Sequence, residues 1–177
     1  MRYAKETTVP VERSRADIEE TLRRYGATEF HSGWKATAAM IAFRLRDLFI
    51  RFVLPLPSKD EDRFRYKKDR SGLKVKRTEL QQVKEWDQEI RQRWRALLLV
   101  VKAKLEAVEC GISTLEQEFL AFIVMPNDLT VGEWLMNDAL PQIKAGSMPK
   151  LLPAPPSEPA PGEVVDAEFA ILWPPRS

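Results

Sequence analysis

A long stretch with the apolar period of an α-helix constrains the fold of this chain more than any other feature. Between residues 78 and 109, apolar side chains recur at intervals of three and four, the spacing of one helical face. Thr78 and Gln81 form a capping box at its start, and Gly111 follows its end. Residues 96–101 are apolar on every side, so we expect burial on several sides or a homodimer interface there.

A period of two among the large apolar side chains predicts strands in the first half of the chain. The alternation runs through residues 36–45 and 48–56, and a shorter strand is expected at 28–31. Turns are expected at 32–35, which contains a glycine, and at 46–47. The three strands should form an antiparallel meander that is apolar on one face.

Shorter helices complete the predicted core. An N-terminal helix is expected to begin at Ser14, with Asp17 in the capping-box position, and to end at Gly26. Two more helices are expected after the long one. The first should run from Ser113, capped with Glu116, to Pro126. The second should begin at a capping box of Thr130 and Glu133, and Pro141 should kink or divide it. Together these elements predict an α+β fold.

Proline is concentrated at the C-terminus, where eight of the 13 prolines lie in residues 149–177. Proline disfavours helix and cannot donate to a strand ladder, so we expect a flexible, disordered tail. The chain should therefore comprise one α+β domain over residues 1–148 and this tail. The tail ends in an acidic–apolar segment whose Phe169, Leu172 and Trp173 are candidates for docking on a partner.

The net charge of +2 conceals two opposed parts. Residues 1–109 carry 25 basic and 17 acidic side chains, whereas residues 110–177 carry 3 basic and 9 acidic ones. Residues 63–77 hold eight basic side chains and one acidic one. Cations attract phosphates and aromatic rings stack on single-stranded bases, so this loop predicts nucleic-acid binding. The candidate contact residues are Arg63, Phe64, Arg65, Tyr66, Lys67, Lys68, Arg70, Lys74, Lys76 and Arg77.

Two alternatives remain for this basic loop: a mobile solvated loop, or a contact surface for a protein with an acidic groove. The pattern does not distinguish DNA from RNA. The acidic tail would cover the loop when no partner is bound. Arginines elsewhere are expected to extend the basic surface, namely Arg44, Arg46, Arg51, Arg91, Arg93 and Arg95.

No group of residues predicts catalysis, a metal site or a cofactor. His31 is the single histidine and Cys110 the single cysteine, which excludes a multi-histidine metal site and an internal disulfide. Neither long strand carries the carboxylates that a metal-dependent nuclease needs. Four glutamates surround the turn at Gly111, but solvated helix ends explain them better than a cation site. We therefore predict a protein that is not an enzyme.

The order helix, three strands, helix over residues 11–109 resembles that of the double-stranded RNA-binding domain. The resemblance is confined to element order. That family has a Lys-rich motif at the start of its second helix, where this chain has Thr78-Glu79-Leu80-Gln81. The long helix is also far longer than the one in that domain.

Several stretches resemble uncharacterised small proteins of tailed bacteriophages and prophages. They are residues 9–14 leading to 24–27, the stretch Arg51-Phe52-Val53-Leu54-Pro55-Leu56-Pro57, and residues 93–97 through 102–109. The resemblance covers residues 7–145 and carries no known activity with it. It implies the cytoplasm of an infected bacterial host.

The leading prediction is a non-enzymatic nucleic-acid-binding accessory protein of phage type, which contacts phosphates through its basic loop. The alternative is a protein-interaction module that inhibits or modifies a host enzyme or defence system. No apolar run approaches the roughly 20 residues that cross a bilayer, and the N-terminus lacks the apolar stretch of a signal peptide. We therefore expect a cytoplasmic protein without a membrane partner.

Overall fold

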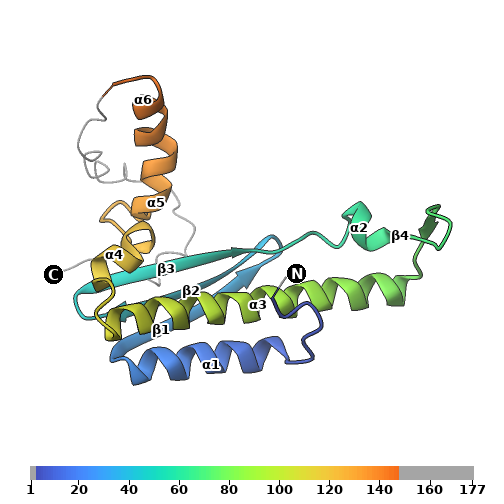
Figure 1. Cartoon of the computed structure of the whole chain (residues 1–177), viewed down its shortest axis with the longest axis horizontal. Coiled ribbons are helices and arrows are strands. Elements are labelled where there is room, and N and C mark those ends of the chain that lie inside the picture. The colour runs from blue at the N-terminus through green and yellow to red at the C-terminus, as the bar shows by residue number, and fades with distance from the viewer. Residues whose placement is uncertain (1–2, 148–177) are drawn as a thin grey trace, which may run out of the picture. The chain divides into compact units, whose positions relative to one another are not determined.

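The computed structural model describes residues 3–147, which form two compact units divided between Phe119 and Leu120 (Figure 1). The predictions for the tail, including its docking residues and its contact with the basic loop, lie outside the described residues. The domain boundary expected at residue 148 is likewise not tested and stays a prediction. Each unit is described by itself.

The first unit is an antiparallel sheet with helices on one face, so the predicted α+β fold is confirmed. The sheet has the order β1-β2-β3, and α1 and α3 lie side by side along it (Figure 1). The elements of this layer are α1 (Val11–Arg24), β1 (Ala27–Lys35), β2 (Ala38–Leu45), β3 (Leu48–Pro55), α3 (Glu79–Glu109) and α4 (Leu115–Phe119).

The core lies between the helices and one face of the sheet. Ile41 pairs with Phe52 and Phe43 with Ile50 across β2 and β3, and all four side chains are buried. Phe119 of α4 is fully buried and meets Phe43 edge-on, with ring centroids 6.1 Å apart. The predicted apolar face is therefore confirmed, and it is closed by a phenylalanine cluster.

The turn predicted at 32–35 is wrong, because β1 continues through Lys35. Gly33 pairs with Met40 and Trp34 with Ala39, which leaves residues 36–37 as the connection to β2. Gly33 has none of the positive φ that its presence suggested. Pairing with β2 supplies the backbone partners that keep these residues extended.

The first helix also begins earlier than predicted. It starts at Val11 directly after Pro10, whose φ of −60° suits a helix entry. Ser14 is therefore inside the helix, fully buried, and its hydroxyl donates to the Pro10 carbonyl over 3.3 Å. The end at Gly26 is confirmed, since this residue has a φ of +90°.

The long helix α3 matches its prediction at both ends. Thr78 and Gln81 form the capping box, and Gly111 has a φ of +69° just beyond the end. Its apolar centre contributes Leu97, Leu98 and Val101 to the unit's own core, whereas Leu99 and Val100 are exposed. Burial within the chain therefore accounts for most of the apolar centre.

The helix expected from residue 113 to Pro126 is mostly absent. Thr114 and Gln117 cap α4 through two hydrogen bonds, in place of the predicted Ser113 and Glu116. Only five residues of α-helix follow, and the chain then forms the 3-10 turn η1 (Leu120–Phe122). The backbone beyond it turns back, with the Val131 N–H donating to the Ile123 carbonyl over 2.9 Å.

The second unit contains short helices and, before them, an antiparallel bridge between Val124 and Thr130 in its described part. Its elements are η1, α5 (Val131–Trp134), the π-helical η2 (Leu135–Ala139) and α6 (Leu140–Lys144). Thr130 and Glu133 form the predicted capping box. Pro141 stands at the start of α6, so the expected division of this helix is confirmed as a π turn before the proline.

Candidate nucleic-acid interface

The basic stretch of residues 63–77 folds into a defined arm with secondary structure. Its sequence lacks any apolar period and therefore predicted a loop. It contains α2 (Asp62–Arg65) and a hairpin of β4 (Tyr66–Lys68) and β5 (Lys74–Lys76). We call residues 62–77 the basic arm. Figure 1 shows it at the end of α3 that lies farthest from α4.

A carboxylate fixes the hairpin turn. Asp69 Oδ1 accepts hydrogen bonds from the Ser71 N–H, the Ser71 hydroxyl and the Leu73 N–H, at 2.6 to 2.9 Å. Gly72 takes the left-handed conformation, with a φ of +86°. This is the usual three-residue hairpin loop that ends in a glycine. The hydrogen bond from Ser71 holds the pKa of Asp69 below its ordinary value of 3.8.

Arg77 closes the base of the arm. Its backbone N–H donates to the Arg65 carbonyl over 2.7 Å. Its guanidinium Nη1 donates to the carbonyls of Arg63 and Tyr66, over 2.8 and 2.6 Å. The two ends of the arm are therefore joined by one side chain.

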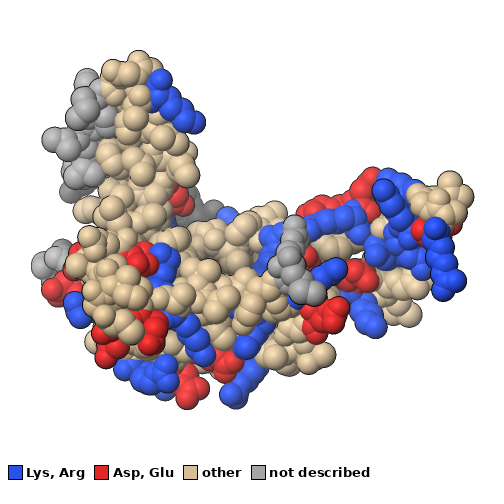
Figure 2. All heavy atoms as spheres, viewed as in Figure 1, with Lys and Arg blue, Asp and Glu red and all other residues tan. Residues whose placement is uncertain are grey.

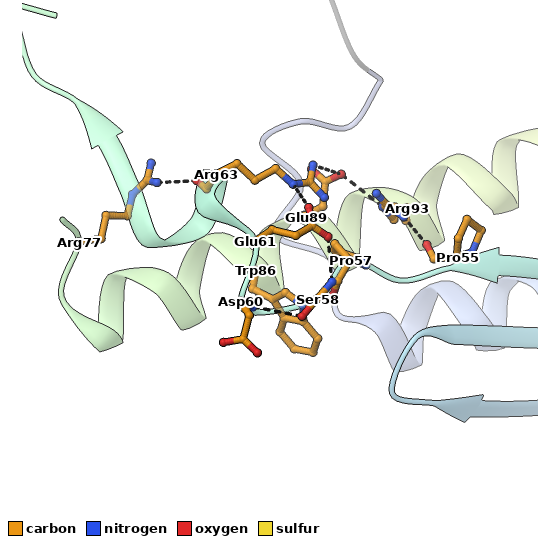
Figure 3. A network of polar contacts seen from close by, with 10 residues as sticks. All are labelled: Pro55, Pro57, Ser58, Asp60, Glu61, Arg63, Arg77, Trp86, Glu89 and Arg93. Carbon is orange, nitrogen blue, oxygen red and sulfur yellow. Dashed lines mark hydrogen bonds and ion pairs between the residues drawn. The ribbon is translucent and has the colours of Figure 1, made fainter. Parts of the chain in front are cut away.

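A network of polar contacts ties the arm and the preceding connection to α3 (Figure 3). Trp86 Nε1 donates to the Pro57 carbonyl over 2.7 Å, and Arg93 donates to the Pro55 carbonyl. Glu89 accepts from both Arg93 and Arg63, which also bonds Glu61 over 2.6 Å. Contacts on both sides of the connection therefore position the arm on α3.

Four of the eight cations predicted to contact nucleic acid instead form the contacts that hold the basic arm in place. Besides Arg63 and Arg77, Arg65 pairs with Asp60 over 2.5 Å. Lys74 pairs with Asp62 over 2.7 Å and lies 4.2 Å from the centre of the Tyr66 ring. This ion pair lowers the pKa of Asp62 and raises that of Lys74. These four cations therefore hold the arm together.

Phe64 does not lie where the predicted stacking role requires. It is only 4% exposed, because α2 packs against α3. The Arg63 guanidinium also lies 4.6 Å from the centre of its ring. Phe64 is the apolar anchor of the arm and offers no ring face to a base. Tyr66 is half-buried, and Lys74 covers its ring.

The other four cations of the arm are exposed and unengaged. Among residues 3–147, no side chain forms an ion pair, hydrogen bond or ring contact with them. They are Lys67, Lys68, Arg70 and Lys76, and we call them the arm cations. Figure 2 shows lysine and arginine side chains gathered over this end of the molecule.

The hairpin register determines how the arm cations are arranged. Tyr66 lies opposite Lys76, and Lys68 lies opposite Lys74, so these four share one face. Lys67 lies opposite Val75 on the other face. Arg70 is in the loop at the tip. The arm therefore presents positive charge on both faces and at its end.

The arginines expected to extend this surface are mostly engaged elsewhere. Arg44 pairs with Glu29 over 2.8 Å, and Arg95 pairs with Asp17 over 3.1 Å. Arg91 donates to the side chain of Gln88, and Arg93 belongs to the network described above. Arg51 is 9% exposed, and only Arg46 of this set is exposed. The predicted extension of the basic surface is therefore wrong for most of these residues.

The remaining candidate residues form no reactive site in the part of the chain that the structure describes. His31 Nε2 lies 3.9 Å from Glu29 Oε2, beyond hydrogen-bonding distance. Cys110 is exposed, and its hydrogen bond to Glu106 raises the pKa of the thiol, which disfavours the reactive thiolate. No acidic, histidine or cysteine group in residues 3–147 is arranged to hold a metal ion. No helix there is long and apolar enough to cross a membrane.

Comparison with known proteins gives no relative: no family model, curated protein or solved structure matches this chain. The phage origin and the nucleic-acid partner therefore stay predictions.

Proposed function

We propose that this protein binds nucleic acid through the basic arm, with Lys67, Lys68, Arg70 and Lys76 contacting phosphates. One observation carries the proposal: four exposed cations without internal partners stand together on a scaffold that the rest of the arm holds in place. Because the hairpin backbone that carries these cations is held in place, less conformational entropy is lost when they bind phosphates than would be lost on a flexible loop. This favours a binding site over a solvated loop.

The hairpin register supports the same proposal. Like charges directly opposite one another destabilise a strand pair, and Lys68 lies directly opposite Lys74. Asp62 compensates Lys74, but no carboxylate of residues 3–147 pairs with Lys68. A like-charge pair that weakens the hairpin, with no compensating contact to Lys68 among the described residues, is typical of a functional surface.

The proposal includes a non-enzymatic, accessory role in an infected bacterial cytoplasm, as the resemblance to phage proteins implies. Phosphate contacts orient a protein on nucleic acid without reading its sequence. Binding through lysines and one arginine should therefore be general rather than sequence-specific.

Two variants with the same change in charge test the proposal. The arm variant carries Lys67→Gln, Lys68→Gln, Arg70→Gln and Lys76→Gln. The control variant neutralises four exposed cations outside the arm through Lys5→Gln, Arg15→Gln, Lys102→Gln and Lys144→Gln. Fluorescence anisotropy with labelled DNA and RNA at about 50 mM salt should show binding that the arm variant loses by tenfold or more. Equal losses in the two variants, or no binding by the unmodified chain, would contradict the proposal.

A protein-interaction role is the second candidate, and the exposed part of α3 favours it. Leu99 and Val100 are 44% and 42% exposed in the middle of an otherwise buried apolar run. If a second copy of the chain covers them, analytical ultracentrifugation will find a dimer that Leu99→Glu converts to a monomer. A monomer at all concentrations would remove the homodimer and leave a host protein as the partner to be sought.

A further inference from the structure

We infer that the basic arm enters the major groove of double-stranded DNA tip first, and that it does not bind single strands by base stacking. The inference rests on the proposed function and specifies its ligand. Two features of the arm support it: its aromatic rings are engaged within the protein, and its cations lie on both faces of the hairpin.

The aromatic side chains of the arm are committed to its own structure. Proteins that bind single strands without sequence preference combine a basic groove with aromatic rings on which successive bases stack. Phe64 is buried, and Tyr66 is half-buried with the Lys74 ammonium over one face of its ring. The arm therefore offers cations without a platform for bases, which suits a duplex whose bases are already stacked.

The cations lie on both faces of the hairpin. A flat array of phosphates meets only one face of a ribbon, whereas a groove has a phosphate backbone along each wall. Lys68 and Lys76 on one face and Lys67 on the other can therefore contact opposite walls. Arg70 in the tip loop would then lead into the groove.

The dimensions of the hairpin match the major groove of B-DNA. A sheet with its side chains is about 10 Å thick, and this groove is about 12 Å wide. Strands of three residues extend about 10 Å, and the groove is about 8.5 Å deep. The hairpin can therefore lie between the two backbones, with its cations within reach of the phosphates on both walls.

Other grooves fit less well. The minor groove of B-DNA is about 6 Å wide, which is narrower than the ribbon. The major groove of A-form RNA is deep and narrow, and its minor groove is shallow, with a single open surface. Cations on both faces of a ribbon therefore predict duplex DNA rather than duplex RNA.

Affinity for four probes of equal length tests this inference. The probes are duplex DNA, single-stranded DNA, duplex RNA, and duplex DNA with bulky substituents at the C5 position of thymine, where the methyl group faces the major groove. We expect the unmodified DNA duplex to bind at least tenfold more tightly than each of the other three. Lys67→Gln and Lys68→Gln should each weaken duplex binding, because they lie on opposite faces.

The outcomes separate the inference from the proposed function. Equal affinity for single strands or for duplex RNA overturns the inference while nucleic-acid binding stands. Indifference to the C5 substituents, or to Lys67→Gln alone, also overturns it, because the arm would then lie on the backbone by one face. Failure to bind any probe overturns the proposed function itself.

Discussion

Replacement of Arg77 tests whether the basic arm is held as the structure shows. Arg77→Met keeps the aliphatic stem and removes the guanidinium, which donates to the carbonyls of Arg63 and Tyr66. The rest of the fold does not depend on these bonds, because the core lies between the sheet and the helices. We therefore expect local opening of the arm without a large change in overall stability.

The expected size of the effect follows from the two hydrogen bonds. A hydrogen bond from a charged donor contributes about 1.5 to 3 kcal/mol, and neither of these two bonds is fully buried, so the lower value applies to each. The loss is then about 3 kcal/mol, which raises the population of the open arm on the order of 100-fold. The midpoint of urea unfolding should change little, since this transition reports the core.

Amide hydrogen exchange measures this opening directly. The Asp69 N–H donates to the Leu73 carbonyl across the turn, and the N–H at position 77 donates to the Arg65 carbonyl at the base. Both amides should exchange on the order of 100-fold faster in Arg77→Met. Lys76→Met is the matched control, because it removes a neighbouring cation that has no internal partner among the described residues. Unchanged exchange in Arg77→Met, or equal acceleration in the control, would refute this account of the arm.

Three further predictions concern the core, the thiol and the turn. Phe119→Ala should lower the free energy of urea unfolding by about 3 to 5 kcal/mol, whereas exposed Val100→Ala should lower it by less than about 1 kcal/mol; similar losses would contradict the phenylalanine cluster. Glu106→Gln should accelerate alkylation of Cys110 by iodoacetamide, because that carboxylate raises the thiol pKa; an unchanged rate would exclude this cause. The lowered pKa of Asp69 means that its stabilisation of the turn is present above pH 3.8 and is lost as the pH falls through the lowered value. Protection of the Leu73 amide should follow this course, and protection that persists in strong acid would contradict it.

Much of the fold was predictable because its signals are local. The capping boxes at Thr78 and Thr130 and the stops at Gly26 and Gly111 each depend on a few neighbouring residues, and all four match the structure. The large apolar side chains that recur every second residue in β2 and β3 likewise lie on the sheet face that packs in the core. Pairing over a longer distance decided the outcome at Gly33, which cross-strand hydrogen bonds keep extended. The helix starts predicted at Ser14 and Ser113 were wrong for a local reason, because Pro10 and Thr114 offer competing starts nearby.

The candidate site was predictable in composition but not in organisation. A run of charged residues has no apolar period, and the arm depends on contacts between distant positions such as Trp86 and Pro57. Two signals could have indicated it: the Ser71-Gly72 pair is a hairpin-turn signal, and a lone Phe64 among charges is a plausible anchor. The division between structural and exposed cations required the positions of Asp60 and Asp62, which no spacing rule supplies.

The salt dependence of duplex binding tests the central claim most directly. Each phosphate contact contributes about −0.9 to the slope of log affinity against log salt, so the four arm cations predict a slope of about −3.6. The arm variant should bring this slope close to zero, and the control variant with four neutralised cations elsewhere should retain it. The same steep slope in the arm variant, or its loss in the control alone, would contradict the claim that the basic arm is the nucleic-acid interface.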